Sequence, residues 1–570
     1  MKTPKGILSI TTIFLLCITS IAGILSMDFT KSYEVINQYG HKVMLYGAGI
    51  YQHDTYFKAP ISIGTDFCIL FVLVPLFIYY YQKHHVQNSV SSKLKLISVY
   101  GVSLYYSASM AFGVTYNSLF LVYIALFSCS LFGIFYHIST LHSHRAITPT
   151  TGIKIFLILS GIALFVAWLP DIIPTLFTGE PLPLIGVYTT EITYVLDMGI
   201  IAPLCFLSLF LLQRKKPMGT LILAILLKLC CIVGIMMISQ TLLQILSHTD
   251  IPLIALFTKS ISFMILACFA YYFERQLYRM LEDEPVKIKK KHLILCSIGG
   301  LFLFILLYWK MPYSPFHEQF IKERQDQAQL TPISTEVCTA EEILQLPEPL
   351  QRYCNYISLE GFPKYNVAHV LFDDTDFVFN TASGKKLTMD YDLWLYQNDI
   401  NRQAYCSSSM FGIPFDGIDY STGHQGGMKG ILGKAIPLFD ECTDQGYQAG
   451  LISWLAECIT LNPSILFSPY VTYETIDDNH VQATITYKGV SGTGIFTLDD
   501  KGAITEFYSD DRQVEKINGV ETKLGWKCTY ANYQEQNGIK SATKVESIKV
   551  FPDHELVYFS SDHFSVHYMN

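Results

Sequence analysis

The sequence predicts an α-helical membrane bundle of about nine spans, followed by a β-rich α+β domain outside the cytoplasm. We expect that domain to be a curled antiparallel sheet or an open β-barrel. Three observations predict this fold class. Nine apolar stretches fill the first 310 of 570 residues, and the charges between them alternate as membrane topology requires. From residue 311 the chain becomes polar, and apolar residues recur with the period of two that is typical of strands.

The apolar stretches predict the spans of a domain that covers residues 1–310. Each approaches the ~20 residues that a helix needs to cross ~30 Å of hydrocarbon. The predicted spans are 6–25, 61–81, 94–112, 119–137, 153–169, 191–212, 218–242, 251–272 and 292–309. The first is either a retained anchor or a cleaved signal peptide with Lys2 and Lys5 as its basic start. Ser20-Ile-Ala22 is a weak cleavage site, which favours the anchor.

Basic residues in the connections predict the orientation, because Lys and Arg accumulate on the cytoplasmic side. One set of connections is basic, and it contains Lys2, Lys5, Lys83, Lys93, Lys95, Arg145, Lys154, Arg214, Lys215, Lys216 and the segment 275–291. The opposite set, around 116, 175–187 and 247–250, has almost no basic residues. Nine spans then place the N-terminus in the cytoplasm and the C-terminal domain outside it, and cleavage of the first span would not change that placement.

The net charge divides at the same boundary. Residues 1–310 contain 22 Lys and Arg against 13 Asp and Glu, a net of +9. Because the whole chain carries a net charge of −8, the remainder has a net of −17. An acidic domain repels phosphate groups, so we expect no nucleic-acid partner.

Four ionisable residues stand out within the apolar stretches: Glu191, Asp197, Lys228 and Lys259. A rise of ~1.5 Å per residue places Asp197 at about 25 Å, Lys259 at about 24 Å and Lys228 at about 18 Å from the cytoplasmic ends of their helices. We therefore expect these three side chains to meet in the outer half of the membrane. Such a cluster is either an ion pair that holds helices together or a site for a charged substrate or a proton relay. The long loop around 46–66 is either a cap over the bundle or a surface that docks onto the outer domain.

The C-terminal part predicts a linker and a strand-rich domain. Residues 311–338 are polar and form the linker or a short helix, and the domain covers 339–570. Helices are expected at 339–360, where Thr339 and Glu342 have the spacing of a capping box, and at 446–459. The expected strands are 367–372, 376–380, 386–391, 393–397, 404–411, 417–422, 471–476, 480–488, 494–498, 504–508, 525–536, 542–550 and 556–564. The glycine-rich segment 423–430 predicts tight turns.

Residues 344–570 resemble a bacterial domain family of unknown function. The resemblance lies in Leu346-Pro-Glu-Pro, in Gly412-Ile-Pro-Phe-Asp416-Gly, in Gly423-His-Gln-Gly and in Leu455-Ala-Glu457, together with Asp511-Arg512 and Trp526. The helical half is similar to multi-span proteins that are also uncharacterised. The resemblance implies no activity and no catalytic residue, and an open β-barrel that holds lipids is the shape we expect by analogy.

Few residues of the outer domain indicate a catalytic or binding site. Glu457 is expected to be buried against Arg512, and Asp511, Arg512 and Glu474 are expected to form a charged cluster at the mouth of a cavity. The candidate site residues of this domain are Asp416, Glu457, Glu474, Asp511, Arg512 and Trp526. The spacing of the histidines predicts no metal site, and no motif indicates a cofactor. Of six cysteines beyond residue 310, Cys338 and Cys354 flank one predicted helix and are our candidate disulfide.

These observations predict a multi-pass protein of the bacterial plasma membrane. Its partners are the lipid bilayer and either a lipid-like ligand or an envelope protein, bound by the outer domain. An alternative is an enzyme that acts on a lipid-linked or envelope substrate. A third hypothesis is that the protein is a transporter whose site is formed by the charged residues of the sixth, seventh and eighth spans.

Overall fold

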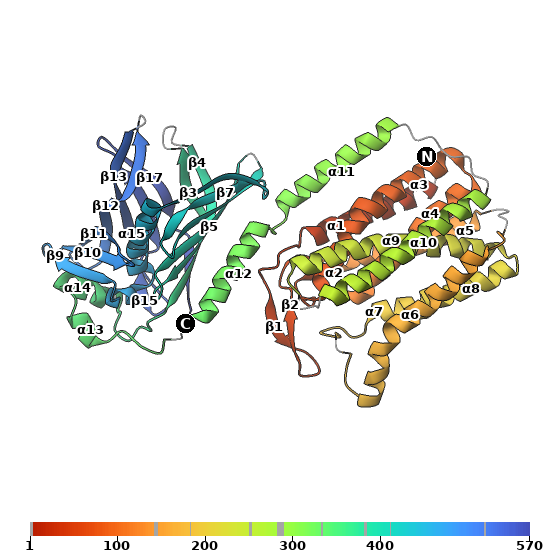
Figure 1. The fold of residues 1–570 in the computed structure, drawn as a ribbon, viewed down its shortest axis with the longest axis horizontal. Helices are drawn as coiled ribbons and strands as arrows, with labels where there is room; N and C mark the ends of the chain where they lie inside the picture. The colour runs from red at the N-terminus through yellow and green to blue at the C-terminus, as the bar shows by residue number, and fades with distance from the viewer. Residues whose placement is uncertain are drawn as a thin grey trace. The chain divides into compact units, whose positions relative to one another are not determined.

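The computed structural model describes residues 4–141, 146–182, 184–249, 253–281, 290–331, 334–380, 385–410, 412–517 and 520–569. The chain divides into two compact units, Met1–Tyr313 and Ser314–Asn570. The first is helical and the second is built on a curled antiparallel sheet (Figure 1). The predicted succession of a helical half with several apolar helices and a curled antiparallel sheet is therefore confirmed.

Helices occupy each of the nine stretches for which spans are predicted. They are α1 (Pro4–Ile24), α2 (Lys58–Cys68) continued by α3 (Val74–Gln87), α4 (Val90–Gly113), α5 (Phe120–Ser139), α6 (Thr151–Thr178), α7 (Ile192–Leu196) continued by α8 (Ala202–Gln213), α9 (Pro217–Leu246), α10 (Leu253–Met280) and α11 (Lys290–Lys310). Single π-helical turns, η2 (Ile69–Leu73) and η3 (Asp197–Ile201), join the two halves of the second and sixth of these helices.

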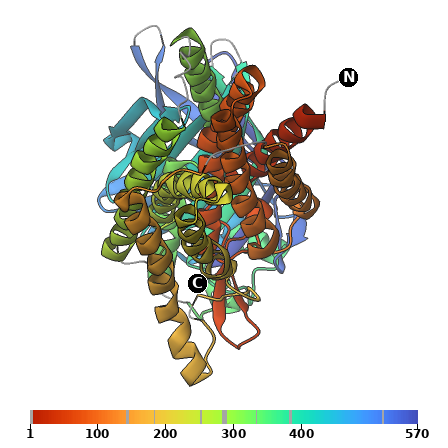
Figure 2. The ribbon, with the colours of Figure 1, turned by 90° about the vertical axis from the view of Figure 1, so that its right-hand side faces the viewer.

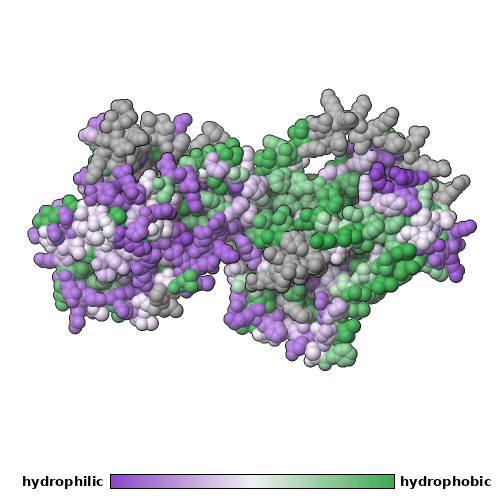
Figure 3. Space-filling model, viewed as in Figure 1, coloured by the Kyte–Doolittle hydropathy of each residue, from purple (hydrophilic) through white to green (hydrophobic). Residues whose placement is uncertain are grey.

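Among the described residues, six helices are long and apolar enough to cross a membrane. Helix α9 packs against α2, α4, α8 and α10, and 67% of its apolar window is buried, so it forms the centre of the bundle. Large apolar side chains such as Phe14, Phe132 and Leu159 are instead exposed on the outer helices. Figure 3 shows apolar residues spread along the sides of this unit.

The long loop after α1 is an ordered cap on one end of the bundle. It contains the hairpin of β1 (Tyr33–Ile36) and β2 (Lys42–Leu45), which projects from the same end as the last turns of α6 (Figure 2). The Asn37 side chain donates to the Gly186 carbonyl. Asp54, which is 1% exposed, accepts hydrogen bonds from the Thr115 amide and from the Tyr188 hydroxyl. These contacts tie three connections together at this end.

In the second unit, fourteen strands of the described residues form one sheet. Its order is β8-β7-β6-β5-β4-β3-β17-β16-β13-β12-β11-β10-β9, with β18 paired to β3, and every pair is antiparallel. The strands are β3 (Val367–Asn380), β4 (Lys385–Tyr396), β5 (Asn401–Met410), β6 (Ile413–Thr422), β7 (Gln425–Leu432), β8 (Ile436–Thr443), β9 (Val471–Thr475), β10 (His480–Tyr487), β11 (Val490–Leu498), β12 (Ile504–Ile517), β13 (Val520–Ala531), β16 (Lys544–Val550), β17 (Glu555–Ser561) and β18 (Phe564–Met569). A small hairpin, β14 (Gln534–Gln536) and β15 (Ile539–Ser541), lies apart from it.

Helix α15 (Asp444–Leu461) lies inside the curl of the sheet. It contacts β5 to β8 near one end of the strand order and β10 to β12 near the other, so the sheet wraps around it (Figure 1). The main core of the unit joins α15 to the inner face of the sheet and to α14 (Glu348–Ile357). A smaller core places α12 (Pro315–Leu330), within the predicted linker, against Trp394 and Tyr405. Because neighbouring strand residues point to opposite faces, the second half of β4 and the first half of β5 bury one face in the main core and the other in this smaller core.

Several element predictions need correction. The expected helix 339–360 is two helices, α13 (Ala340–Leu344) and α14, because Pro347 and Pro349 interrupt the hydrogen bonding of a continuous helix. The capping box of Thr339 and Glu342 is present at α13. Residues 367–380 form one bulged strand rather than two.

The glycine-rich segment is the larger error. Gly423 and His424 form a two-residue turn with positive φ, while 425–432 is strand β7.

Candidate functional site

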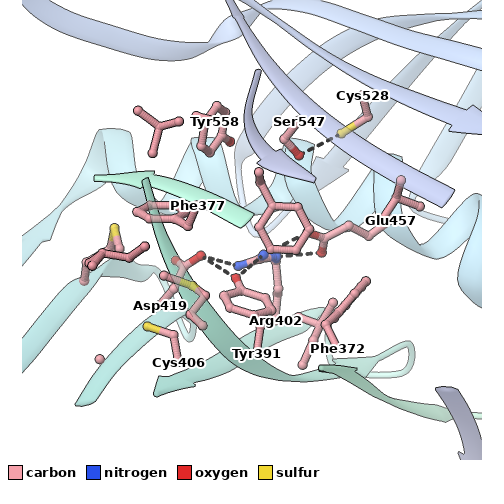
Figure 4. Close-up of a pocket in the computed structure, with 18 of the residues that line it drawn as sticks. Phe372, Phe377, Tyr391, Arg402, Cys406, Asp419, Glu457, Cys528, Ser547 and Tyr558 are labelled. Carbon is pink, nitrogen blue, oxygen red and sulfur yellow. Dashed lines mark hydrogen bonds and ion pairs between the residues drawn. The ribbon is translucent and has the colours of Figure 1, made fainter. Parts of the chain in front are cut away.

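The curled sheet encloses a cavity of about 720 Å³ between α15 and strands that include β4, β6, β13, β16 and β17. Its wall follows the period of two expected for one face of a sheet, with Leu387, Met389, Tyr391 and Leu393 from β4. Phenylalanine and leucine side chains of β3, β6, β7, β8 and β17 complete a largely apolar lining (Figure 4). A cavity of this size lies within the range of about 300–1,000 Å³ that is typical of small-molecule sites.

One buried guanidinium forms the polar part of this lining. Arg402 of β5, 4% exposed, donates from Nε to Glu457 Oε2 at 2.7 Å and from Nη2 to Glu457 Oε1 at 2.8 Å. Its Nη1 donates to Asp419 at 2.7 Å, and Nη2 donates to the Tyr391 hydroxyl at 2.9 Å. Figure 4 shows these groups converging from β4, β5, β6 and α15. The network joins the helix to three strands.

The surroundings of Arg402 keep its guanidinium charged. Burial by itself lowers the pKa of Arg402, but Glu457, Tyr391 and Asp419 together raise it well above its ordinary value. Burial raises the pKa of Tyr391 well above its ordinary value, so its hydroxyl stays protonated and donates to Asp419 at 3.1 Å. A bidentate carboxylate–guanidinium pair is strong and directional. It fixes Glu457 in one orientation at the base of the cavity.

The predicted partner of Glu457 is wrong, because the carboxylate pairs with Arg402 and not with Arg512. Arg512 of β12 donates from Nε to the Ser453 hydroxyl at 2.8 Å, and its guanidinium lies 4.1 Å from the centre of the Trp526 ring. Glu457, Arg512 and Trp526 nevertheless all line the cavity. Arg402 and Asp419 are functional candidates that our sequence reasoning missed. The alternation of side chains along a strand is the signal that would have found them. Arg402 lies on the same strand face as Cys406, and Asp419 lies on the same face as Gly417, and all four line the cavity.

The other three outer-domain candidates do not line this cavity. Asp416 is 3% exposed, points away from Phe415 and Gly417, and accepts from the Ser314 hydroxyl at 2.7 Å. Asp511 accepts from the amide and the hydroxyl of Thr493. Glu474 is exposed on β9, opposite Gln482. The charged cluster predicted for Glu474, Asp511 and Arg512 is therefore not formed.

Cys338 and Cys354 lie in the same buried core, and both carry free thiols in this structure. Burial raises the pKa of both thiols to about 12. Among the described residues, no group of His, Cys, Asp and Glu side chains has the arrangement of a metal site.

Among the described residues of the helical unit, Glu191, Asp197 and Lys228 contact different side chains. Lys228 contacts Glu274 at 2.8 Å and donates to the Tyr80 hydroxyl at 3.1 Å. Asp197, the first residue of the π-helical turn η3, accepts from the Tyr105 hydroxyl and from the Trp168 indole. The side chain of Lys259 lies outside the described residues. The predicted meeting of Asp197 and Lys228 is therefore not found.

Glu191 and Asp197 do share a second cavity, of about 550 Å³, within the helical unit. Glu191 pairs there with Lys58 at 2.7 Å. Trp168 and Tyr194 stack with ring centres 4.6 Å apart, and their polar atoms donate to Asp197 and to Asp171 respectively. The cavity therefore combines aromatic walls with three acidic groups and one lysine.

Comparison with known proteins places the second unit beside a family without an assigned activity. Residues 336–561 match a family of unknown function (DUF6544), which confirms the resemblance seen in the sequence. No curated protein matches the chain. A solved structure of a LolA superfamily protein from Nitrosomonas europaea is similar at 12% identity over 40% of this chain and 92% of that chain, with a TM-score of 0.21. A likeness at that TM-score carries no argument about ligand or mechanism.

Proposed function

We propose that the second unit binds an amphiphile with a long apolar tail in the sheet cavity, and that the first unit anchors it in the bacterial plasma membrane. The observation that carries the proposal is the composition of the cavity wall. Aromatic and aliphatic side chains supply most of it, and the Arg402 guanidinium is paired with two carboxylates. Such a wall gains free energy when an apolar group replaces water against it.

The apolar side chains come from several elements and surround the space. Phe372 and Phe377 of β3 and Tyr558 of β17 approach it from different sides (Figure 4), and Phe415 of β6 also lines it. Each CH₂ group that leaves water contributes about 0.8 kcal/mol. An acyl or alkyl chain would therefore bind here through many small contributions, without a specific hydrogen bond along its length.

The membrane part of the proposal rests on the helices and on the charges between them. Six helices of the described residues have the length and composition of spans, and apolar side chains are exposed on their outer faces. In a water-exposed bundle such side chains would be unfavourable, whereas lipid tails solvate them. The basic connections support a cytoplasmic N-terminus, so the cavity would open on the extracytoplasmic side.

Photoaffinity labelling tests the proposal on the full chain. Membranes that contain the protein would be exposed to hexadecanol carrying a diazirine, irradiated, and digested for mass spectrometry. We expect labelled peptides from β3, β4, β16 and β17, which line the cavity. Ser547→Phe places a ring in the cavity, because Ser547 points into it (Figure 4). It should reduce this labelling about tenfold, since displacing two or more CH₂ contacts of about 0.8 kcal/mol each has that effect.

Ser565→Phe is the matched control, because Ser565 is exposed on strand β18, which pairs with β3, and does not line the cavity. It should leave the labelling unchanged. Labels confined to the helices of the first unit, or labelling of the strands that is insensitive to Ser547→Phe in a variant that melts normally, would overturn the proposal.

A further inference from the structure

A second guanidinium lines the sheet cavity and takes no part in the Arg402 network. Arg512 is half-buried, and its Nε donates to the Ser453 hydroxyl of α15 at 2.8 Å. The plane of Trp526 lies against its charge, 4.1 Å from the guanidinium carbon. Among the residues that the structure describes, no carboxylate forms an ion pair with Arg512. Its two terminal nitrogens are therefore available to a ligand in the cavity.

An irregularity in strand β12 explains why Arg512 reaches the cavity. Ser509 is opposite Trp526 and Gln513 is opposite Leu524, so the three residues 510–512 face Gly525 alone. Extra residues of this kind bend a strand and change the direction of their side chains. The two acidic neighbours are engaged elsewhere, since Asp510 accepts from Tyr508 and Asp511 accepts from Thr493. The bulge thus presents the cation without its adjacent anions.

Tyr558 adds a neutral donor to the same wall. Its oxygen accepts from the Trp526 indole at 2.9 Å, which leaves the hydroxyl hydrogen to donate to another group. Burial raises the pKa of Tyr558, and the charge of Arg512 offsets part of that increase. The hydroxyl is therefore protonated at neutral pH. Lys549 of β16 is opposite Trp526 in the sheet, and its Nζ lies 5.4 Å from the centre of the Tyr558 ring.

The charges of the described lining residues favour an anion. The two acidic lining residues, Asp419 and Glu457, both bind Arg402. Neither of them therefore offsets the positive charge of Arg512. We call the wall formed by Arg512, Trp526 and Tyr558 the cationic wall.

We propose that the cationic wall binds the oxyanion of an amphiphile, a carboxylate or a phosphate, whose tail occupies the apolar part of the cavity. The planar fork of a guanidinium matches both oxyanions, and a low-polarity surrounding strengthens the contact. This inference rests on the proposed function for the tail and adds the class of headgroup. It distinguishes an anionic amphiphile from a neutral one of equal length.

Two photoreactive probes of equal chain length test it on the full chain in membranes: a diazirine-bearing hexadecanoic acid and the corresponding alcohol. At pH 8 the acid should label the cavity strands about tenfold more strongly than the alcohol, as expected for one charge-assisted contact. Arg512→Gln should remove this preference, so that the acid labels the cavity strands no more strongly than the alcohol does. Arg512→Lys should keep part of it, because the positive charge remains while the fork is lost.

Lys527→Gln is the matched control for charge. Lys527 follows Trp526 on β13, points to the other face of the sheet and pairs there with Glu506 and Glu555. It should leave the preference intact. Hexadecyl phosphate that carries the same diazirine provides the phosphate arm of the test, and stronger labelling by either anion than by the alcohol supports the inference.

The outcomes separate this inference from the proposed function. Equal labelling of the cavity strands by acid, phosphate and alcohol would overturn the cationic wall and leave apolar binding in place. A preference that persists in Arg512→Gln, in a variant that melts like the wild type, would also overturn it. Absence of labelling by all three probes would overturn the proposed function itself.

Discussion

Arg402 shows how one buried residue determines the interior of the sheet unit. Its guanidinium satisfies Glu457 and Asp419 at once, and those side chains come from the central helix and from a neighbouring strand. A buried ion pair is weak evidence for stability when compared with an apolar replacement of both partners. Removal of a single partner is different, because the remaining charge is left without compensation. The acids, 21% and 26% exposed, depend on Arg402 in this way.

We therefore predict that Arg402→Leu lowers the free energy of unfolding of the second unit by about 3 kcal/mol, the range expected when one partner of a buried pair is removed. Denaturant unfolding of the full chain, followed by tryptophan fluorescence, would measure it, because Trp394, Trp454 and Trp526 are all buried in this unit. Arg402→Lys should lose less, because one ion pair remains. An unchanged unfolding midpoint for Arg402→Leu would mean that water in the cavity already solvates both carboxylates.

Asp54 predicts a pH dependence in the cap of the helical unit. Burial raises its pKa to about 6, although Thr115 and Tyr188 donate to it. A carboxyl group whose pKa is higher in the folded state stabilises the fold most at low pH, and this stabilisation is lost as the pH rises through the folded value. The stability contributed by Asp54 should therefore fall between pH about 4 and about 6, by about 3 kcal/mol.

The measurement compares the thermal unfolding of the full chain with that of Asp54→Asn between pH 4 and 7. The amide keeps the acceptor oxygen for the Thr115 amide and cannot ionise. The two proteins should melt alike near pH 4, and the variant should melt higher near pH 7. A difference in melting temperature that stays constant with pH would refute this assignment.

At the scale of elements, the sequence predicted the strands that alternate and missed those that do not. The apolar stretches of the helical half and the alternating residues of β10 were sufficient to predict those elements. Strands β7 and β8 were not predicted. Glycines interrupt the alternation of β7, and β8 is exposed on both faces at the edge of the sheet. The pairing of Glu457 with Arg402 was not predicted for another reason. Which side chains meet across a curled sheet depends on its register and curvature, and the spacing of residues along the chain does not contain that information.

The glycines of β7 are explained by packing, and this gives a prediction. A Cβ on Gly426 would lie 2.3 Å from the amide nitrogen of Tyr447, so α15 packs directly on the strand backbone there. Gly426→Ala should destabilise the unit by about 3 kcal/mol, the upper range for overpacking a core, because backbone atoms would have to move. Gly423 meets nothing within 4 Å but has a φ of +59°. Gly423→Ala should cost only about 1 kcal/mol, the strain of a left-handed conformation.

Equilibrium unfolding of the two variants, measured side by side, separates these effects. The order of the two losses is the decisive result. Equal losses would mean that α15 adjusts to the extra methyl group at no greater cost than the turn, and the close approach of helix and strand would not be a requirement of the fold.

For the whole molecule, the division of charge and hydropathy predicts how the chain is placed in a membrane. The acidic, hydrophilic second unit follows a helical unit whose outer helices expose apolar side chains (Figure 3). The connections rich in Lys and Arg, such as 214–216 between α8 and α9, alternate with connections that have almost none, such as 114–119 between α4 and α5. If the N-terminus is cytoplasmic, an odd number of spans, such as the nine predicted, places the second unit outside.

Reporter fusions test this placement. Alkaline phosphatase, which folds only outside the cytoplasm, should be active when fused after residue 569 and after residue 248, and inactive when fused after residue 281. The reason is the bias of Lys and Arg towards the cytoplasm, to which the connection between α8 and α9 contributes three adjacent basic residues, 214–216. A fluorescent protein that matures only in the cytoplasm should give the opposite pattern at the same sites. Activity after residue 281 with none after residue 569 would reverse the orientation and place the amphiphile cavity in the cytoplasm, where its ligand would have to come from the inner leaflet.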